Sequence, residues 1–251
     1  MPGGSQRQRM RDAQLANQRS ARLRRITIVG SALLAVVLVA VMVVVLVQRN
    51  QKPAATASEL AYPPNATAAR DGIVVNDNAG KPDVGVYFDY QCPVCKQFEG
   101  AYGASLKQLA TSGEIELHYR NMTFLDINLN NDASLRAGIG AACSDFAGKY
   151  SDYHDQIYAN QPATEGQGYT DAMLRDTIPA TVGIAGADLT SFQTCYDNQA
   201  TKAFVNGTNE QASKDKVNAT PTVHVNGKDL PLKTIAAVAP SGLGDLIKQN
   251  A

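Results

Sequence analysis

The sequence predicts an α/β domain with an all-helical insertion, preceded by a single N-terminal transmembrane helix. Three observations predict it: a 22-residue uncharged segment at residues 26–47, strand and helix patterns that alternate beyond residue 70, and a block of helical spacings at about 131–217. With 251 residues, 44% apolar and 18% charged, the chain can bury a sizeable core. Its balance of 23 basic and 23 acidic residues argues against a dedicated nucleic-acid binder.

The N-terminal end is typical of a membrane anchor. Residues 1–25 contain seven arginines and one acid, and the uncharged segment 26–47 follows them directly. As a helix, this segment would be about 33 Å long, which matches the hydrocarbon thickness of a bilayer. Because basic flanks stay inside, we expect residues 1–25 to be a cytoplasmic tail of a single-pass cell-membrane protein, with the rest outside the cytoplasm. A cleaved signal peptide is the alternative, although its apolar core would be shorter.

Residues 48–70 are rich in Pro, Ala and Thr, so we expect a flexible linker between the membrane and a folded domain at 71–251. In that domain the apolar run Val84–Tyr90 predicts a buried strand, and Glu114–Asn121 predicts a second one. A helix between them should end near Gly113, because its apolar residues recur at helical spacing. Those residues are Phe98, Tyr102, Leu106 and Leu109.

The helical insertion, about 131–217, contains four sets of apolar residues at helical spacing. The sets are Leu135, Ile139 and Ala142; Tyr153, Ile157 and Tyr158; Met173, Leu174 and Ile178; and Leu189, Phe192 and Tyr196. Beyond the insertion, Thr222–Asn226 predicts a strand, Gly227-Lys228 a turn, and Leu243–Gln249 a last helix.

The pair Cys92-Pro93-Val94-Cys95 lies between a predicted strand and a predicted helix. Cys92 should therefore begin the helix, where unpaired N–H groups and the helix dipole stabilise a thiolate. Pro93 is compatible with this position, because an N–H group in the first turn of a helix has no partner within the helix, so its absence in proline costs nothing. We therefore expect a redox pair. A zinc site is a weaker alternative, because Cys143 and Cys195 form no second pair of this spacing, and two unrelated thiols are another.

The segment Phe88–Cys95 resembles the active-site segment of membrane-anchored bacterial DsbA-type thiol-disulfide oxidoreductases, and Ala219–Lys228 is similar to the cis-proline loop of that family. The resemblance covers residues 70–250 and implies a thioredoxin-like fold. It implies Cys92 as the attacking thiol, Cys95 as the resolving thiol, and Pro221 as the cis-proline beside them. Thioredoxin itself fits less well, because Gln91 stands where its tryptophan is expected.

Thr220-Pro221 supports this interpretation, because X-Pro is the one bond where a cis peptide costs little. A cis bond would turn the Thr220 backbone toward Cys92, where a substrate chain could pair with it; an ordinary trans proline at a strand entry is the alternative. Cys143 and Cys195 should form a structural disulfide outside the cytoplasm, although free thiols or a second redox pair stay open.

We therefore predict an extracytoplasmic enzyme that introduces disulfides into secreted or periplasmic cysteine-containing proteins. The resemblance suggests a membrane quinone-linked reoxidase of the DsbB or vitamin K epoxide reductase type as partner. A reductase or isomerase of the same fold, or a non-catalytic binding or chaperone module, are the alternatives. We expect no cofactor and no metal, since the three histidines lack ligand spacing. For the acids Asp89 and Glu99 we expect a solvated surface role; the alternative is that they tune the pKa of the nearby thiols.

Overall fold

The computed structural model describes residue 42, which lies in a helix, and residues 61–251. The predicted cytoplasmic tail, the transmembrane segment apart from Met42, and the linker up to residue 60 lie outside the described residues. Among the residues described, no helix has both the length and the apolar character needed to cross a membrane.

The described part of the chain contains a five-stranded sheet with the order β1-β3-β2-β4-β5. The central strand β2 (Asp83–Asp89) runs parallel to β3 (Glu116–Met122) and antiparallel to β4 (Thr222–Val225). The outer strands are β1 (Ile73–Val75) and β5 (Lys228–Asp229), both antiparallel to their neighbours. Since β2 is hydrogen-bonded on both sides, its end is a rigid base for the cysteine loop that follows.

The chain between β2 and β3 is helical, as predicted. It forms α2 (Pro93–Phe98), a π-helical turn (Glu99–Gly103) and α3 (Ala104–Thr111). Gly113 has a φ of +75°, which ends the helix where the sequence predicts. The sequence does not predict the π-helical turn.

The helices of the insertion follow β3, and α4 (Phe124–Leu129) already precedes the predicted start near residue 131. The others are α5 (Ala133–Ser144), α6 (Tyr150–Ala159), a π-helical turn (Met173–Thr177) that continues as α7 (Ile178–Thr181), α8 (Gly186–Asp197) and α9 (Lys202–Lys214). A 3₁₀ turn (Asp145–Ala147) joins α5 to α6. No individual set of apolar residues predicts α4 or α9.

The C-terminal part confirms the predicted strand and last helix. Short helix α10 (Leu232–Ile235) and a 3₁₀ turn (Pro240–Gly242) precede α11 (Leu243–Gln249). The turn between β4 and β5 lies one residue earlier than predicted. It is formed by Asn226 and Gly227, whose φ angles are +48° and +75°, and Lys228 already belongs to β5. Asn and Gly are the residues that adopt this backbone at least cost.

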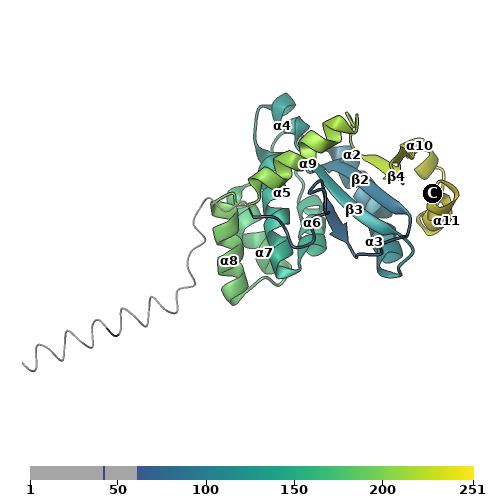
Figure 1. The fold of residues 1–251 in the computed structure, drawn as a ribbon. Coiled ribbons are helices and arrows are strands. Elements are labelled where there is room, and N and C mark those ends of the chain that lie inside the picture. The colour runs from purple at the N-terminus through teal and green to yellow at the C-terminus, as the bar shows by residue number, and fades with distance from the viewer. Residues whose placement is uncertain (1–41, 43–60) are drawn as a thin grey trace, which may run out of the picture. The chain divides into compact units, whose positions relative to one another are not determined.

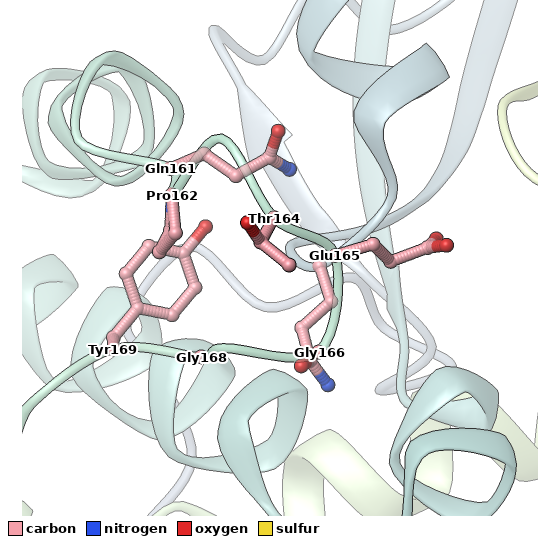
Figure 2. Close-up of a pocket in the computed structure, with 8 residues that line it drawn as sticks. Gln161, Pro162, Thr164, Glu165, Gly166, Gly168 and Tyr169 are labelled. Carbon is pink, nitrogen blue, oxygen red and sulfur yellow. The ribbon is translucent and has the colours of Figure 1, made fainter.

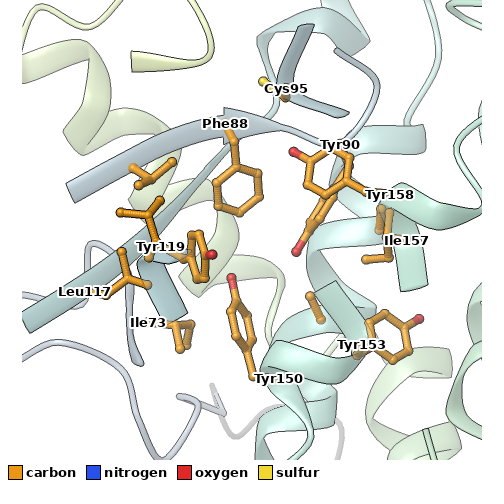
Figure 3. Packing of buried hydrophobic residues seen from close by; sticks show 14 of the residues in the cluster. Ile73, Phe88, Tyr90, Cys95, Leu117, Tyr119, Tyr150, Tyr153, Ile157 and Tyr158 are labelled. Atoms are coloured by element: carbon orange, nitrogen blue, oxygen red, sulfur yellow. The ribbon is translucent and has the colours of Figure 1, made fainter. Parts of the chain in front are cut away.

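The two faces of the sheet pack differently. On one face, Tyr87 and Met122 pack with Ala212 of α9 and with Val217. The other face carries the main core. There Phe88 of β2 and Tyr90, which directly follows the strand, pack against aromatic residues of the helical insertion (Figure 3). In the view of Figure 1 the insertion helices α5 to α8 lie to the left of the sheet and α10 and α11 to its right, and Ile235 of α10 and Ile247 of α11 belong to the same main core. The core therefore joins the sheet to the insertion directly beneath the cysteine loop.

His118 on β3 gives the fold a dependence on pH. Its side chain is 10% exposed and lies 3.1 Å from Asp83 Oδ1 and 2.8 Å from Glu116 Oε1. Burial lowers the pKa of this imidazole, but the interactions with Asp83 and Glu116 outweigh burial and raise it above the ordinary value of 6.5. The folded protein therefore holds a proton that the unfolded chain releases.

We expect this contribution to the free energy of unfolding to be complete below about pH 6.5 and to be lost as pH rises through the folded-state pKa of His118. Urea unfolding of the wild type and of His118→Gln, compared from about pH 5.5 to about pH 9, checks this. The difference between the two proteins should shrink as pH rises. A difference that is constant or grows with pH would contradict the assignment to His118.

Candidate active site

Cys92 and Cys95 lie at the start of α2, as predicted. Cys92 is the N-cap residue, and its Sγ accepts a hydrogen bond from the Cys95 N–H at 3.4 Å. Neither cysteine is bonded to another cysteine among the described residues, so the structure represents the dithiol form. Cys92 is 7% exposed and Cys95 only 1%. A reagent would therefore reach Cys92 first.

The two thiols have opposite acidities. A hydrogen bond from the Cys95 thiol, opposed by burial and helped by the Cys95 and Val94 N–H groups, lowers the pKa of Cys92 to about 6. Burial raises the pKa of Cys95 well above its usual value, and the Cys92 sulfur adds to this effect. At neutral pH the arrangement therefore holds one thiolate, on Cys92, and one neutral thiol, on Cys95.

Thr220 and Pro221 lie beside this pair. The Thr220–Pro221 peptide bond is cis, as predicted, and the Thr220 carbonyl oxygen is 3.5 Å from Cys92 Sγ. The contact exists because β4, which follows directly, pairs with β2, which precedes Cys92. The sheet thus brings together two segments that lie 128 positions apart in the chain.

Cys143 and Cys195 form a disulfide that links α5 to α8 within the insertion, with their Cα atoms 5.9 Å apart. The predicted pairing is therefore confirmed in the structure. Its partners lie 52 positions apart.

The prediction of a solvated surface role for Asp89 and Glu99 is wrong. Asp89 is fully buried at the end of β2, where its Oδ1 accepts hydrogen bonds from Ser134 Oγ (2.5 Å) and the Gln91 N–H (2.9 Å), and its Oδ2 accepts one from the Leu125 N–H (3.2 Å). Burial raises the pKa of Asp89 to about 7 although these bonds oppose the shift. The helical insertion covers this carboxylate, and no local sequence pattern predicts that burial.

The side chain of Glu99 is only 7% exposed, and its Oε1 is 3.5 Å from His154 Nε2. His154 belongs to α6 and stacks on Tyr119, and its Nδ1 is 3.0 Å from the Tyr90 hydroxyl. His154 therefore packs among Tyr90, Tyr119 and Tyr158, aromatic residues of the core that Figure 3 labels. In the part of the chain that the structure describes, no three His, Cys, Asp or Glu side chains gather as metal ligands.

Two insertion residues that the sequence does not single out hold the backbone of the cysteine loop. Gln161 Nε2 donates to the carbonyls of Tyr90 (2.8 Å) and Cys92 (3.0 Å), and the Tyr169 hydroxyl donates to Tyr90 at 2.6 Å. Both residues line a small pocket beside the loop (Figure 2). The remaining lining residues are Gln91, Pro162, Thr164, Glu165, Gly166 and Gly168. The sequence distance of about 70 positions explains why no motif reveals these contacts.

A dithiol at a helix start, with one acidic and one buried sulfur beside a cis-proline, defines a thiol-disulfide redox centre. The family model described as thioredoxin matches residues 69–248, and the chain belongs to this family. The chain is 24% identical over 171 residues to disulfide bond formation protein D of Bacillus subtilis, which covers 65% of this chain and 73% of that protein. The probable disulfide bond formation protein D of Bacillus cereus is 25% identical over 154 residues, 59% of this chain and 68% of the relative.

Solved structures share the fold. MdbA, a thiol-disulfide oxidoreductase from Actinomyces oris, superposes with a TM-score of 0.61 at 20% identity, over 78% of this chain and 96% of that one. Reduced DsbA from Mycobacterium tuberculosis gives 0.57 at 23% identity, over 72% and 92%. The predicted thioredoxin-like fold is thereby confirmed. The protein is a DsbA-like thiol-disulfide oxidoreductase.

Proposed function

We propose that the protein introduces disulfide bonds into secreted, cysteine-containing proteins outside the cytoplasm. The observation that carries this proposal is the acidity of Cys92, whose pKa is lowered to about 6. Stabilising the Cys92 thiolate stabilises the dithiol relative to the disulfide, so the disulfide form readily takes electrons from a substrate. The names of the Bacillus relatives, which are disulfide bond formation proteins, support the same direction of electron flow.

In the proposed reaction a substrate thiolate attacks Sγ of Cys92 in the Cys92–Cys95 disulfide. The S–S bond breaks, Cys95 leaves and takes up a proton, and a mixed disulfide joins the substrate to Cys92. A second substrate thiolate then attacks the substrate sulfur of this mixed disulfide and releases the Cys92 thiolate. The substrate loses two electrons and two protons and gains one disulfide, and the enzyme pair gains the two electrons.

Thr220 and Pro221 are the proposed substrate-binding residues, because the Thr220 backbone lies beside Cys92 and a substrate strand could pair with it there. The reduced pair would pass its electrons to a membrane quinone-linked reoxidase of the DsbB or vitamin K epoxide reductase type. The proposed role of the Cys143–Cys195 disulfide is structural, since it joins two helices of the insertion.

The reduction potential of the Cys92–Cys95 pair tests the direction of the reaction. We expect it to lie near that of strong oxidants, about −120 to −180 mV, when the purified protein is equilibrated with glutathione buffers. A value near −270 mV, as in thioredoxin, would favour the reductase alternative. A protein whose cellular role survives Cys92→Ser would instead be a binding module.

We also propose that residues 26–47 anchor the protein in the cell membrane, with residues 1–25 as cytoplasmic tail, 48–70 as linker and 71–251 as outer domain with its helical insertion at about 131–217. The uncharged length of residues 26–47 and the arginines before it support this layout.

Protease added to intact cells whose outer envelope layers have been removed should digest the domain beyond residue 48 and leave residues 1–25 protected, because the bilayer separates them. Detection with one antibody against each end measures both fates in the same sample. A mature N-terminus near Ala57 would contradict the anchor and indicate a cleaved signal peptide.

A further inference from the structure

Gln91 directly precedes Cys92, yet its side chain points away from the cysteines into the helical insertion. It is 3% exposed, and its amide nitrogen lies 2.8 Å from Asp126 Oδ1, 2.9 Å from Asn131 Oδ1 and 3.0 Å from Ser134 Oγ. Its amide oxygen accepts a hydrogen bond from Asn131 Nδ2 at 3.0 Å. We call these four residues, Gln91, Asp126, Asn131 and Ser134, the Gln91 clasp.

The clasp fixes the orientation of the Gln91 amide. The nitrogen is the only part of the group that can face the Asp126 carboxylate, because an amide oxygen there would meet another acceptor. Ser134 Oγ donates its proton to Asp89 Oδ1 and so accepts from Gln91. Each buried donor of the amide thus has an acceptor, which makes an alternative position of Gln91 costly.

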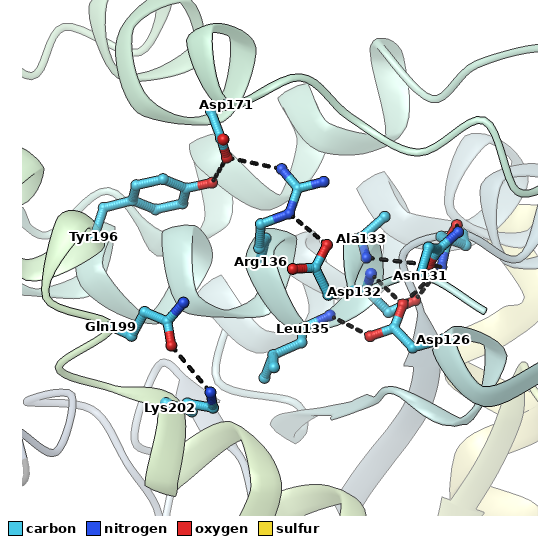
Figure 4. Close-up of polar contacts among 12 residues, drawn as sticks. Asp126, Asn131, Asp132, Ala133, Leu135, Arg136, Asp171, Tyr196, Gln199 and Lys202 are labelled. Atoms are coloured by element: carbon cyan, nitrogen blue, oxygen red, sulfur yellow. Dashed lines mark hydrogen bonds and ion pairs between the residues drawn. The ribbon is translucent and has the colours of Figure 1, made fainter. Parts of the chain in front are cut away.

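The clasp is anchored in the first turn of α5, which Figure 4 shows. Asp126 accepts hydrogen bonds from the N–H groups of Ser134 (2.8 Å) and Leu135 (2.9 Å), and Asn131 accepts one from Ala133 (3.2 Å). Helix α5 has 12 residues and is buried over most of its length. Gln91 therefore contacts α5 directly through Ser134 and indirectly through Asp126 and Asn131, which bind the first N–H groups of this helix.

The next residue along the chain is the one that needs an accurate position. Cys92 Sγ is 3.4 Å from the Cys95 N–H, a contact that a small displacement would break. The Cys92 N–H is itself bonded to the Asp89 carbonyl at 3.0 Å, and the Gln91 N–H to the Asp89 carboxylate. Hydrogen bonds of its backbone and of the Gln91 side chain thus both hold the segment from Asp89 to Cys92 in place.

We propose that Gln91 is a positioning residue for thiol-disulfide exchange: its amide, held by Asp126, Asn131 and Ser134, keeps the Cys92 sulfur against the N–H groups that begin α2. The role of Gln91 in the cell rests on the proposed function. The test of the proposal is independent of the direction of electron flow, because it concerns the free dithiol without a protein substrate.

The test is the pH dependence of Cys92 alkylation by iodoacetamide in the reduced, purified protein, together with the ultraviolet absorbance of the thiolate. In Gln91→Met, which keeps the length of the side chain and removes its polar contacts, we expect the pKa of Cys92 to rise by about one unit. At about pH 5 the thiolate fraction and the alkylation rate should then fall about tenfold. Cys92→Ser, which lacks the reacting thiol, identifies the absorbance and the rate that belong to Cys92.

The matched control is Tyr153→Phe, which removes a buried hydrogen bond of 2.5 Å to the Leu174 carbonyl, elsewhere in the insertion. It should lower the urea midpoint and leave Cys92 alkylation unchanged. If Gln91→Met fails to fold, Asn131→Ala removes two of the Gln91 contacts from a partly exposed position and should show the same direction of change.

A charge variant separates pairing from general stability. Gln91→Glu places a carboxylate oxygen against the acceptors Asp126 Oδ1 and Asn131 Oδ1 and should impair Cys92 alkylation at least as much as Gln91→Met. An unchanged pH profile in Gln91→Met and Asn131→Ala, or an equal shift in Tyr153→Phe, would overturn the proposal. A reduction potential near that of thioredoxin would overturn the proposed function and leave this one standing.

Discussion

Replacing Cys95 with alanine is expected to convert the protein into a trap that accumulates mixed disulfides with its substrates. A substrate disulfide would still be attacked by the Cys92 thiolate, whose pKa of about 6 keeps it ionised at neutral pH. Cys95, the sulfur that can displace a bound substrate from Cys92 within the enzyme, would be missing, so that only a second substrate thiolate could still release the adduct. Non-reducing gels of cells that express Cys95→Ala should show bands of higher mass that collapse to the monomer with dithiothreitol.

The matched variant is Cys92→Ser, which should show almost no such bands, because Cys95 is 1% exposed and its pKa is raised well above the usual value by burial. We expect the two variants to differ by at least tenfold in adduct yield, since only one of them keeps an accessible thiolate. Adducts in Cys92→Ser and none in Cys95→Ala would reverse the roles of the two sulfurs. The absence of adducts in both would favour a non-catalytic binding module.

Removal of the Cys143–Cys195 disulfide is expected to lower the free energy of unfolding strongly while the active-site thiol keeps its reactivity. The bond closes a loop between residues 52 positions apart, for which the chain-entropy model gives about 4 kcal/mol. Urea unfolding of Cys143→Ala/Cys195→Ala at pH 7 measures this loss. Alkylation of Cys92 in the folded variant should follow the wild-type pH profile, because Cys143 lies at the end of α5 that is remote from Ser134.

The control for this variant is the wild type with the Cys92–Cys95 pair reduced and the Cys143–Cys195 disulfide intact, so that the two proteins differ only at residues 143 and 195. Peptide mapping without reductant should recover Cys143 and Cys195 as one linked pair from the wild type. Two free thiols at these positions in the folded, oxidised protein would contradict the structural role.

The sequence by itself determined the parts of the site that depend on neighbours along the chain. The strand before Cys92 follows from a run of apolar residues and the helix after it from apolar residues at a period of three to four, and the spacing of Cys92 and Cys95 corresponds to one helical turn. Thr220-Pro221 was recognisable from the resemblance of Ala219–Lys228 to the cis-proline loop of the DsbA-type family, and the low cost of a cis X-Pro bond agrees with it. The pairing of Cys143 with Cys195 followed from chemistry, since two thiols outside the cytoplasm that belong to no motif tend to join.

The tertiary structure alone decided where polar side chains lie. Aspartate usually lies on the protein surface. Asp89 is instead buried, because Ser134 and the Leu125 N–H, about 40 positions away in the chain, cover its carboxylate and donate hydrogen bonds to it. From the sequence, Gln91 was notable only because thioredoxin has a tryptophan at this position. In the structure its amide binds Asp126 and Ser134, at the start of α5. A single polar residue has no periodicity to mark its surroundings, and its partners approach only when the helical insertion folds back on the end of β2.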